Sequence, residues 1–433
     1  MGTVASYALG CKVNQYESEA IAELFEERGY NIVDINERAD IYIINTCTVT
    51  NFGDKKSRQL IRKVKRQNKD SILVVVGCYA QASPEEISNI EGINIIVGTK
   101  NKSDIVDIVE NYKKEKINKI KNYVTDIMEE KEFEYLKVNR LNNKTRAYIK
   151  IQDGCNQFCS YCIIPYVRGP IRSRNINDII NEVKILSKNG FKEIVLTGIH
   201  IASYGKDIEN SSLLDVVKLI NNIDGVSRIR FSSLEPTIIT DDFVKSLSQL
   251  HKVCNHFHLS LQSGCDKTLK EMNRKYDTKK YSNSVRILRK YIPDVAITTD
   301  IIVGFPGETD YDFEESYNFA KSIDFTKIHI FPYSPKKGTL AAKRDDQILN
   351  SIKQYRVKKF IELDNLMYKN FINKYINKKV EVLFEKSISN NFYEGYTKNY
   401  IKVFAKSDKN IQNQILNIYI NGIKDNELIG FVE

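Results

Sequence analysis

The sequence predicts a mixed α/β fold in three parts: an N-terminal parallel sheet with helices, a central partial (β/α)6 barrel and a small C-terminal antiparallel β-barrel. Three observations lead to this prediction. Short β-branched runs alternate with segments of helical length over residues 3–110, the alternation returns after Arg146, and five short strand-like runs fill residues 380–432. The predicted domains are residues 1–110, 144–370 and 371–433, with a linker at 111–143.

Strand–helix alternation in the N-terminal domain favours parallel strands, because each crossover must return the chain to the same sheet. The expected strands are Val4–Leu9, Ile41–Asn45, Ile72–Val76 and Ile93–Val97. The first helix is expected from Gln15 to Arg28, with Gly29 as its stop signal, and a later helix begins at Pro84.

Residues 111–144 are highly charged and lack strand alternation, so we predict a linker there. The strands expected after it are Ala147–Gln152, Glu193–Thr197, Arg228–Ser233, His256–Leu261, Ala296–Val303 and Lys327–Pro332. Six βα units predict a partial barrel with its chemistry at the carboxyl ends of the strands.

The pattern changes again after a helix expected over residues 350–378. Five short strands follow, at Val380–Glu385, Phe392–Tyr396, Tyr400–Phe404, Ile415–Ile420 and Leu428–Val432. Short strands at such close spacing predict a small antiparallel barrel.

Composition narrows the class of protein. The chain has 433 residues, 65 Lys and Arg against 55 Asp and Glu, and a formal net charge of +10. This charge fits a polyanionic partner, although codon-composition drift would produce the same excess. The longest purely apolar run, Ile72–Val76, is far too short to cross a bilayer, so we expect a cytoplasmic protein without a membrane partner. Eight cysteines in a reducing compartment are expected to be core residues, nucleophiles or metal ligands rather than disulfides.

The sharpest motif is Cys155-Asn-Gln-Phe-Cys159-Ser-Tyr-Cys162, directly after the first strand of the central barrel. Three thiolates within eight residues favour an iron–sulfur cluster or zinc. A structural zinc site would require a fourth protein ligand, commonly from a second CxxC or His pair, and the sequence contains no such pair. Three ligands on a four-iron cluster instead leave one iron open for a cofactor.

Cys11, Cys47 and Cys78 each fall one or two residues after a predicted strand. Parallel strands of an open α/β sheet end at the same edge, so these cysteines can converge on one site although they are far apart in sequence. Burial as small apolar residues is the alternative, and it is our interpretation of Cys254 and Cys265.

Four phrases contain these six cysteines: LGCKVNQYESEA, INTCTVTNFGDKKSRQ, VVVGCYAQ and GCNQFCSYCIIPYVRGPIRSR. Together they resemble the radical S-adenosylmethionine (SAM) methylthiotransferase family over essentially the whole chain. The LGCKVNQYE form most resembles the bacterial branch that acts on N6-threonylcarbamoyladenosine (t6A) in tRNA.

The resemblance implies two [4Fe–4S] clusters, an auxiliary one on Cys11, Cys47 and Cys78 and a SAM-binding one on Cys155, Cys159 and Cys162. It also implies that one SAM yields a radical at carbon 2 of the adenine, that a second SAM methylates sulfur on the auxiliary cluster, and that the C-terminal barrel is a TRAM-like RNA-binding domain. The implied substrate is t6A at position 37 of the anticodon loop, and the implied reductant is flavodoxin or ferredoxin. The sulfur donor is not identified.

Further phrases match the family's barrel motifs at predicted strand ends. They supply the candidate SAM contacts Tyr161, Gly198, Glu235, Gln262 and Asp300.

Candidate RNA contacts are of two kinds. Guanidinium groups after the cluster loop and basic or aromatic residues of the C-terminal barrel suit phosphate attraction and base stacking. These candidates are Arg168, Arg172, Arg174, Lys398 and Tyr400.

Three other functions remain open from the sequence: a methylthiotransferase for isopentenyladenosine in tRNA, one for a ribosomal protein side chain, and a non-catalytic zinc-containing RNA-binding protein.

Overall fold

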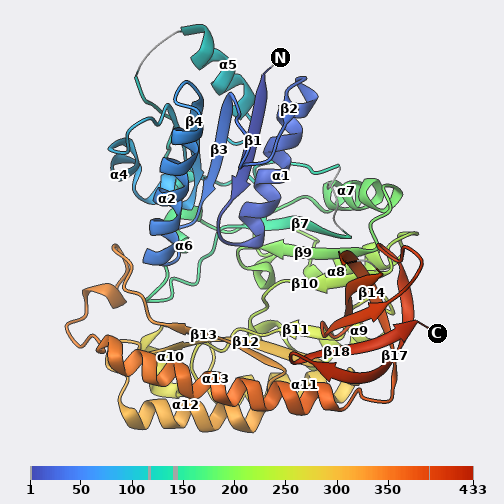
Figure 1. Cartoon of the computed structure of the whole chain (residues 1–433). Coiled ribbons are helices and arrows are strands. Elements are labelled where there is room, and N and C mark those ends of the chain that lie inside the picture. The colour runs from blue at the N-terminus through green and yellow to red at the C-terminus, as the bar shows by residue number, and fades with distance from the viewer. Residues whose placement is uncertain (1, 116–118, 140–144, 390, 433) are drawn as a thin grey trace.

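The N-terminal domain is a six-stranded parallel sheet in the order β2-β1-β3-β4-β5-β6, with helices on both faces (Figure 1). The computed structural model of the chain describes residues 2–115, 119–139, 145–389 and 391–432. The strands are β1 (Thr3–Ala8), β2 (Asn31–Ile32), β3 (Ile41–Thr46), β4 (Ile72–Gly77), β5 (Ile95–Val97) and β6 (Lys121–Asn122). One face is covered by α1 (Lys12–Glu27) and α5 (Ile105–Glu115), and the other by α2 (Asn51–Gln67), α3 (Cys78–Ala82) and α4 (Pro84–Ser88).

Strands β3 and β4 explain why the apolar runs are continuous rather than alternating. Ile41, Ile43 and Val74 pack under α1 and α5, whereas Ile44 and Val75 pack under α2 and α4. A parallel sheet covered on both faces buries both sets of side chains. The predicted strands are confirmed, with β5 beginning two residues later than expected.

The segment predicted as a linker is largely structured where it is described. Helix α5 extends into it, and β6 adds a sixth strand to the sheet. Leu136 and Val138 are buried in the core of the central domain, and the Tyr16 hydroxyl donates to the Leu136 carbonyl at 2.6 Å. Sequence analysis does not identify this buried stretch, because it is short and the residues around it are charged. Residues 116–118 and 140–143 lie outside the described part.

The central domain confirms the predicted partial barrel of six parallel strands. They are β7 (Arg146–Asp153), β9 (Glu193–Gly198), β10 (Arg228–Phe231), β11 (His256–His258), β12 (Ala296–Val303) and β13 (Lys327–Pro332). Isolated bridges such as Leu234 to Leu259 join β10 to β11. The short β8 (Arg172–Ser173) pairs antiparallel with β7 and was not predicted.

Helices of the central domain alternate with these strands and cover the outside of the barrel (Figure 1). They are α7 (Ile176–Lys188), α8 (Leu213–Asn221), α9 (Asp241–Ser248), α10 (Asp266–Glu271), α11 (Thr278–Tyr291), α12 (Asp310–Ile323) and α13 (Asn350–Asn373). The short α6 (Ile164–Arg168) instead contacts α3 of the N-terminal domain. Helix α13 ends five residues before the predicted end.

The C-terminal strands form a closed barrel in the order β14-β15-β16-β18-β17. They are β14 (Lys379–Ser389), β15 (Phe392–Thr397), β16 (Lys402–Lys406), β17 (Ile415–Lys424) and β18 (Glu427–Val432). The β16–β18 pair is parallel, so the barrel is antiparallel except at this junction. The sequence predicts a strand that begins at Tyr400, but Tyr400 instead lies in a turn at φ +69°, and β16 begins at Lys402.

Arginines of the central domain dock the C-terminal barrel. Arg228 donates to the Tyr396 carbonyl at 2.7 Å and pairs with Glu381 at 3.0 Å. Arg146 pairs with Glu385 at 2.5 Å, and both side chains are mostly buried. These contacts hold the edge of the C-terminal barrel against β7 and β10.

In the part of the chain that the structure describes, no helix combines the length and apolar character needed to cross a membrane.

Candidate metal centres

Cys11, Cys47 and Cys78, here called the N-terminal triad, lie at the carboxyl edge of the N-terminal sheet. Cys11 is the N-cap of α1, Cys47 follows β3 and Cys78 begins α3. Their strands β1, β3 and β4 are neighbours in the sheet. The turn at Gly10 has φ +95°, and a Cβ there would lie 2.7 Å from the Cys47 sulfur. The missing side chain at position 10 therefore allows the Cys11 turn to approach Cys47.

Arg168 connects this triad to the central domain. Its Nε donates to the Cys78 sulfur at 3.2 Å, and its Nη2 donates to Asn14 Oδ1 at 2.7 Å. Asn14 Oδ1 also accepts from the Cys11 sulfur at 3.7 Å. Arg168 thus holds the Cys78 sulfur directly and the Cys11 sulfur through Asn14.

Arg168 belongs to a buried cluster of charges between the two domains. It pairs with Glu17 at 2.6 Å, Lys150 pairs with Glu17 at 2.8 Å, and the Lys102 ammonium lies 3.6 Å from the same carboxylate. Lys150 also pairs with Asp153 at 2.5 Å. Burial raises the pKa of the Glu17 carboxyl, but the three cations outweigh it and hold that pKa well below its usual range.

Cys155, Cys159 and Cys162, here called the barrel triad, occupy the loop after β7. The Cys155 amide donates to the Gly169 carbonyl and the Cys162 amide to the Cys159 carbonyl, both at 3.0 Å. Arg274 donates from Nη1 to the Cys159 sulfur at 3.3 Å. Each triad therefore has one sulfur that accepts a hydrogen bond from a mostly buried arginine.

Burial raises the pKa of four of the six cysteine thiols, Cys11, Cys47, Cys155 and Cys162. Burial raises the pKa of Cys47 to about 12, that of Cys155 to about 11 and that of Cys162 to about 12. Thiols of this kind become thiolates at neutral pH when a metal replaces the proton. The donor set is that of an iron–sulfur cluster or a zinc ion.

The sulfur atoms of neither triad form a compact group in the described residues. Over the described ranges, the group of three ligand atoms within 4.8 Å of one another is Cys265, Asp312 and Glu315, so neither triad is that compact. Thiolates on one zinc ion lie about 3.8 Å apart, given tetrahedral geometry and a Zn–S distance of about 2.3 Å. Over the described residues, neither triad therefore brings its three sulfur atoms as close together as three thiolates on one zinc ion.

Two of the candidate SAM contacts lie beside the barrel triad. Glu235 is buried, and its carboxylate lies 3.3 Å from Arg274 and 3.2 Å from His200. Tyr161 is partly buried and packs against a small apolar cluster that includes Met272 and Phe305. Their position keeps both as candidates for the cofactor pocket.

The other three candidate SAM contacts are distributed around the carboxyl ends of the strands. A Cβ at Gly198 would lie 2.8 Å from the Gln152 carbonyl, so packing against β7 already requires glycine there. Gln262 has φ +70°, and its backbone N–H donates to the backbone carbonyl of Asp300 at 2.9 Å. The Asp300 carboxylate lies 3.3 Å from His258 Nε2. Contact of these residues with SAM stays a prediction.

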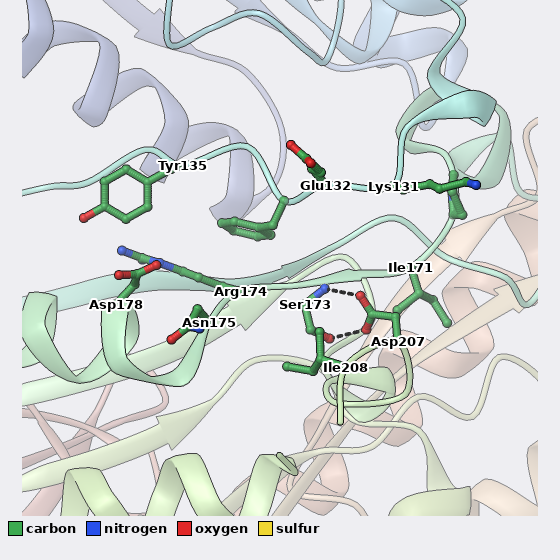
Figure 2. Close-up of a pocket in the computed structure, with 12 residues that line it drawn as sticks. Lys131, Glu132, Tyr135, Ile171, Ser173, Arg174, Asn175, Asp178, Asp207 and Ile208 are labelled. Carbon is green, nitrogen blue, oxygen red and sulfur yellow. Dashed lines mark hydrogen bonds between the residues drawn. The ribbon is translucent and has the colours of Figure 1, made fainter. Parts of the chain in front are cut away.

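The arginines predicted to bind RNA are buried. Arg168 is paired with Glu17, and Arg172 donates to the Arg168 carbonyl at 2.9 Å. Arg174 is bonded to Glu182 and lies under the Tyr135 ring, with 5.1 Å between guanidinium and ring centre (Figure 2). A buried guanidinium that already bonds a carboxylate or a carbonyl is not free for phosphate, so this burial argues against the three predicted contacts.

Lys398 and Tyr400 lie between the C-terminal and central barrels. The Lys398 ammonium donates to the His251 carbonyl at 3.3 Å. The Tyr400 hydroxyl accepts from Arg146 at 2.7 Å, and its ring stacks on Tyr396 with centres 5.0 Å apart. Tyr400 therefore forms part of the interface as well as a candidate stacking surface.

Sequence reasoning missed Arg274, Asn14 and the ionic partners of Arg168. A signal existed for two members of the buried charge cluster around Arg168. Lys150 stands in the middle of a buried strand and Glu17 on the buried face of α1, and charged residues at core positions are rare unless paired. Arg274 carries no comparable signal, because its partner Cys159 is remote in sequence.

Comparisons with known proteins agree with this arrangement. A family model described as the Radical SAM superfamily matches residues 149–320, and one described as uncharacterized protein family UPF0004 matches residues 3–98. A solved radical SAM methyltransferase, TsrM from Kitasatospora setae, is similar in fold, with TM-score 0.60, 13% identity, and coverage of 78% of this chain and 74% of that chain. The fold and the barrel triad thus define a radical SAM protein, a class that holds a [4Fe–4S] cluster and SAM.

Curated relatives narrow the class. The chain is 43% identical to threonylcarbamoyladenosine tRNA methylthiotransferase MtaB of Bacillus subtilis, over 97% of this chain and 94% of the relative. It is 38% identical to tRNA-2-methylthio-N(6)-dimethylallyladenosine synthase of Clostridium novyi, over 87% of this chain and 84% of that protein. The chain belongs to the tRNA methylthiotransferase family.

Proposed function

We propose that the protein adds a methylthio group to carbon 2 of t6A at position 37 of the tRNA anticodon loop, using two [4Fe–4S] clusters and SAM. The observation that carries this proposal is the pair of cysteine triads joined through one residue. Arg168 follows the barrel triad by six residues in sequence, and it bonds the Cys78 sulfur of the N-terminal triad. The two triads are therefore linked by one side chain. A reaction that generates a radical at one centre and supplies sulfur from another needs two centres that face the same substrate.

The barrel triad would hold the cluster that binds SAM. When bound, these groups supply a carbon radical able to remove the inert hydrogen at carbon 2, which acid–base chemistry does not. Arg274 would hold the Cys159 sulfur and neutralise part of its charge, while the Glu235 carboxylate lies 3.3 Å from Arg274 and balances its charge. We propose that the protein acts in the cytoplasm and that flavodoxin or ferredoxin supplies the electron that reduces this cluster.

The N-terminal triad would hold the auxiliary cluster and the sulfur to be transferred. Asn14 and Arg168 bond the Cys11 and Cys78 sulfurs, so they would orient these ligands. Three cysteines leave one iron of such a cluster open, as sulfur delivery requires.

The t6A branch is supported by the relatives and by the LGCKVNQYE phrase. The Bacillus subtilis relative with the t6A name is 43% identical, compared with 34% and 38% for relatives from Acetivibrio thermocellus and Clostridium novyi with the dimethylallyladenosine name. The latter modification is the second candidate substrate.

Purified, anaerobically reconstituted enzyme tests the proposal when it is given tRNA carrying t6A, isopentenyladenosine or unmodified adenosine at position 37. We expect the methylthio nucleoside from t6A tRNA alone, measured by mass spectrometry of digested RNA. Product from the isopentenylated tRNA alone would assign the chain to the other branch. Absence of iron in protein purified anaerobically would favour the zinc alternative.

A further inference from the structure

A cavity of about 400 Å³ lies where the three domains meet. Lys12 at the start of α1, inward-facing residues of the central barrel, and the edge of the C-terminal barrel line it. This volume lies within the usual range for small-molecule sites, about 300–1,000 Å³, so it suits one base with its substituent rather than paired RNA.

Lys12 gives the cavity an unbalanced positive charge. Over the described residues no carboxylate oxygen lies within 4.0 Å of its ammonium, which instead lies 5.8 Å from the centre of the Tyr148 ring. The other two lysines of the lining, Lys327 and Lys402, each lie within 4.0 Å of a carboxylate. A half-buried ammonium without a counter-ion favours an anionic ligand group.

The carboxylates of the lining are engaged elsewhere. Asp300 lies 3.3 Å from His258 Nε2, and Glu427 accepts from the Tyr368 hydroxyl at 3.1 Å. Neither therefore satisfies Lys12, and the cavity keeps room for a carboxylate from a ligand.

Part of the cavity lining is aromatic. The rings of Tyr396 and Tyr400 stack at 5.0 Å with an interplanar angle of 23°, and the His256 ring lies 5.0 Å from Tyr400. His256 Nδ1 is buried and has no hydrogen-bond partner among the residues that the structure describes. Flat rings with one free polar atom suit a splayed nucleobase, which proteins hold by stacking and by bonds to its edge.

We propose that this cavity binds the modified base of the substrate and that Lys12 selects it by pairing with the carboxylate of its threonyl group. The inference rests on the proposed function. Lys12 directly follows Cys11, so a carboxylate held there would keep the attached base close to the N-terminal triad. A base with an uncharged substituent would leave the ammonium unpaired and would bind less well.

The test compares anticodon stem–loop RNAs with t6A and with its neutral methyl ester, using the wild-type protein, K12Q, K12R and the control K113Q. Lys113 also belongs to the N-terminal domain and also lies over a tyrosine ring, Tyr30 at 4.8 Å, but it does not line the cavity. Binding is measured by fluorescence anisotropy, turnover by nucleoside mass spectrometry, and iron content shows whether the clusters are intact.

We expect K12Q to weaken binding of the t6A RNA by about 10- to 150-fold, the range for losing a hydrogen bond to a charged group. Binding of the ester should stay unchanged, K12R should restore part of the preference, and K113Q should behave as wild type. A K12Q protein with full iron that still prefers t6A over the ester would overturn the assignment of Lys12. Wild-type turnover of isopentenylated RNA alone would instead contradict the proposed function, so the two failures are distinguishable.

Discussion

Removing either partner of the buried Glu17–Arg168 ion pair is expected to destabilise the protein by about 3–5 kcal/mol. Both side chains are fully buried, and two hydrogen bonds of 2.6 and 3.1 Å join them. E17Q leaves Arg168, Lys150 and Lys102 without the carboxylate that they share. R168M should cost less within this range, because Glu17 keeps Lys150 at 2.8 Å.

The double variant E17Q/R168M removes both charges together, so it should cost less than the sum of the single changes. Urea unfolding of the full-length, anaerobically reconstituted protein, followed by circular dichroism, measures each difference. The exposed pair of Arg28 and Asp107, at 2.8 Å, is the control, and its neutralisation is expected to have no measurable effect. If the loss of unfolding free energy in the double variant equals the sum of the two single losses to within about 0.5 kcal/mol, the two residues are not coupled and the reasoning is refuted.

Further predictions concern acid, iron and RNA. The pKa of Glu17 is lower in the folded protein than in the unfolded chain. The stability that Glu17 contributes is therefore fully present above the unfolded pKa of about 4.3 and is lost as the pH falls. The free energy of unfolding of E17Q should accordingly decrease less on acidification than that of the wild type. Iron analysis should give about eight irons per chain, and about four after the barrel triad is changed to Ala; loss of all iron in that variant would contradict separate sites. A variant with Ala at the N-terminal triad should still cleave SAM but insert no sulfur. Lys386 and Lys406 are exposed on the C-terminal barrel, so K386Q and K406Q should each lower the salt dependence of tRNA binding by about one unit of slope, and unchanged slopes would place the RNA elsewhere.

The sequence predicted the positions of both triads because those positions depend on local structure. A cysteine that directly follows a buried β-branched run lies at a strand end, and neighbouring parallel strands end at one edge of the sheet. Cys47 after β3 and Cys78 after β4 follow this rule.

The contacts of the arginines were not predictable in the same way. RGPIRSR is a basic phrase that is typical of an RNA-binding loop, yet Arg168 and Arg174 are turned inward by Glu17 and Glu182. Glu17 lies 151 residues from Arg168, and only tertiary packing brings them together. A buried basic cluster and an exposed one have the same composition, so charge pattern alone does not separate them.

The first turns of α1 link the candidate metal centre of the N-terminal triad, the interdomain ion cluster and the proposed substrate cavity. Residues three apart share a face of a helix, so Cys11, Asn14 and Glu17 form one row, and Arg168 bonds both Asn14 and Glu17. Lys12 lies about 100° around the helix from Cys11 and lines the cavity instead. Because α1 is one rigid element, a shift that weakened the ion cluster would also displace Cys11, the proposed cluster ligand, and the Lys12 ammonium, which we propose binds the substrate. The seven residues from Cys11 to Glu17 therefore contribute to all three sites from one helix. This is a physical reason why the LGCKVNQYE phrase is so characteristic a motif.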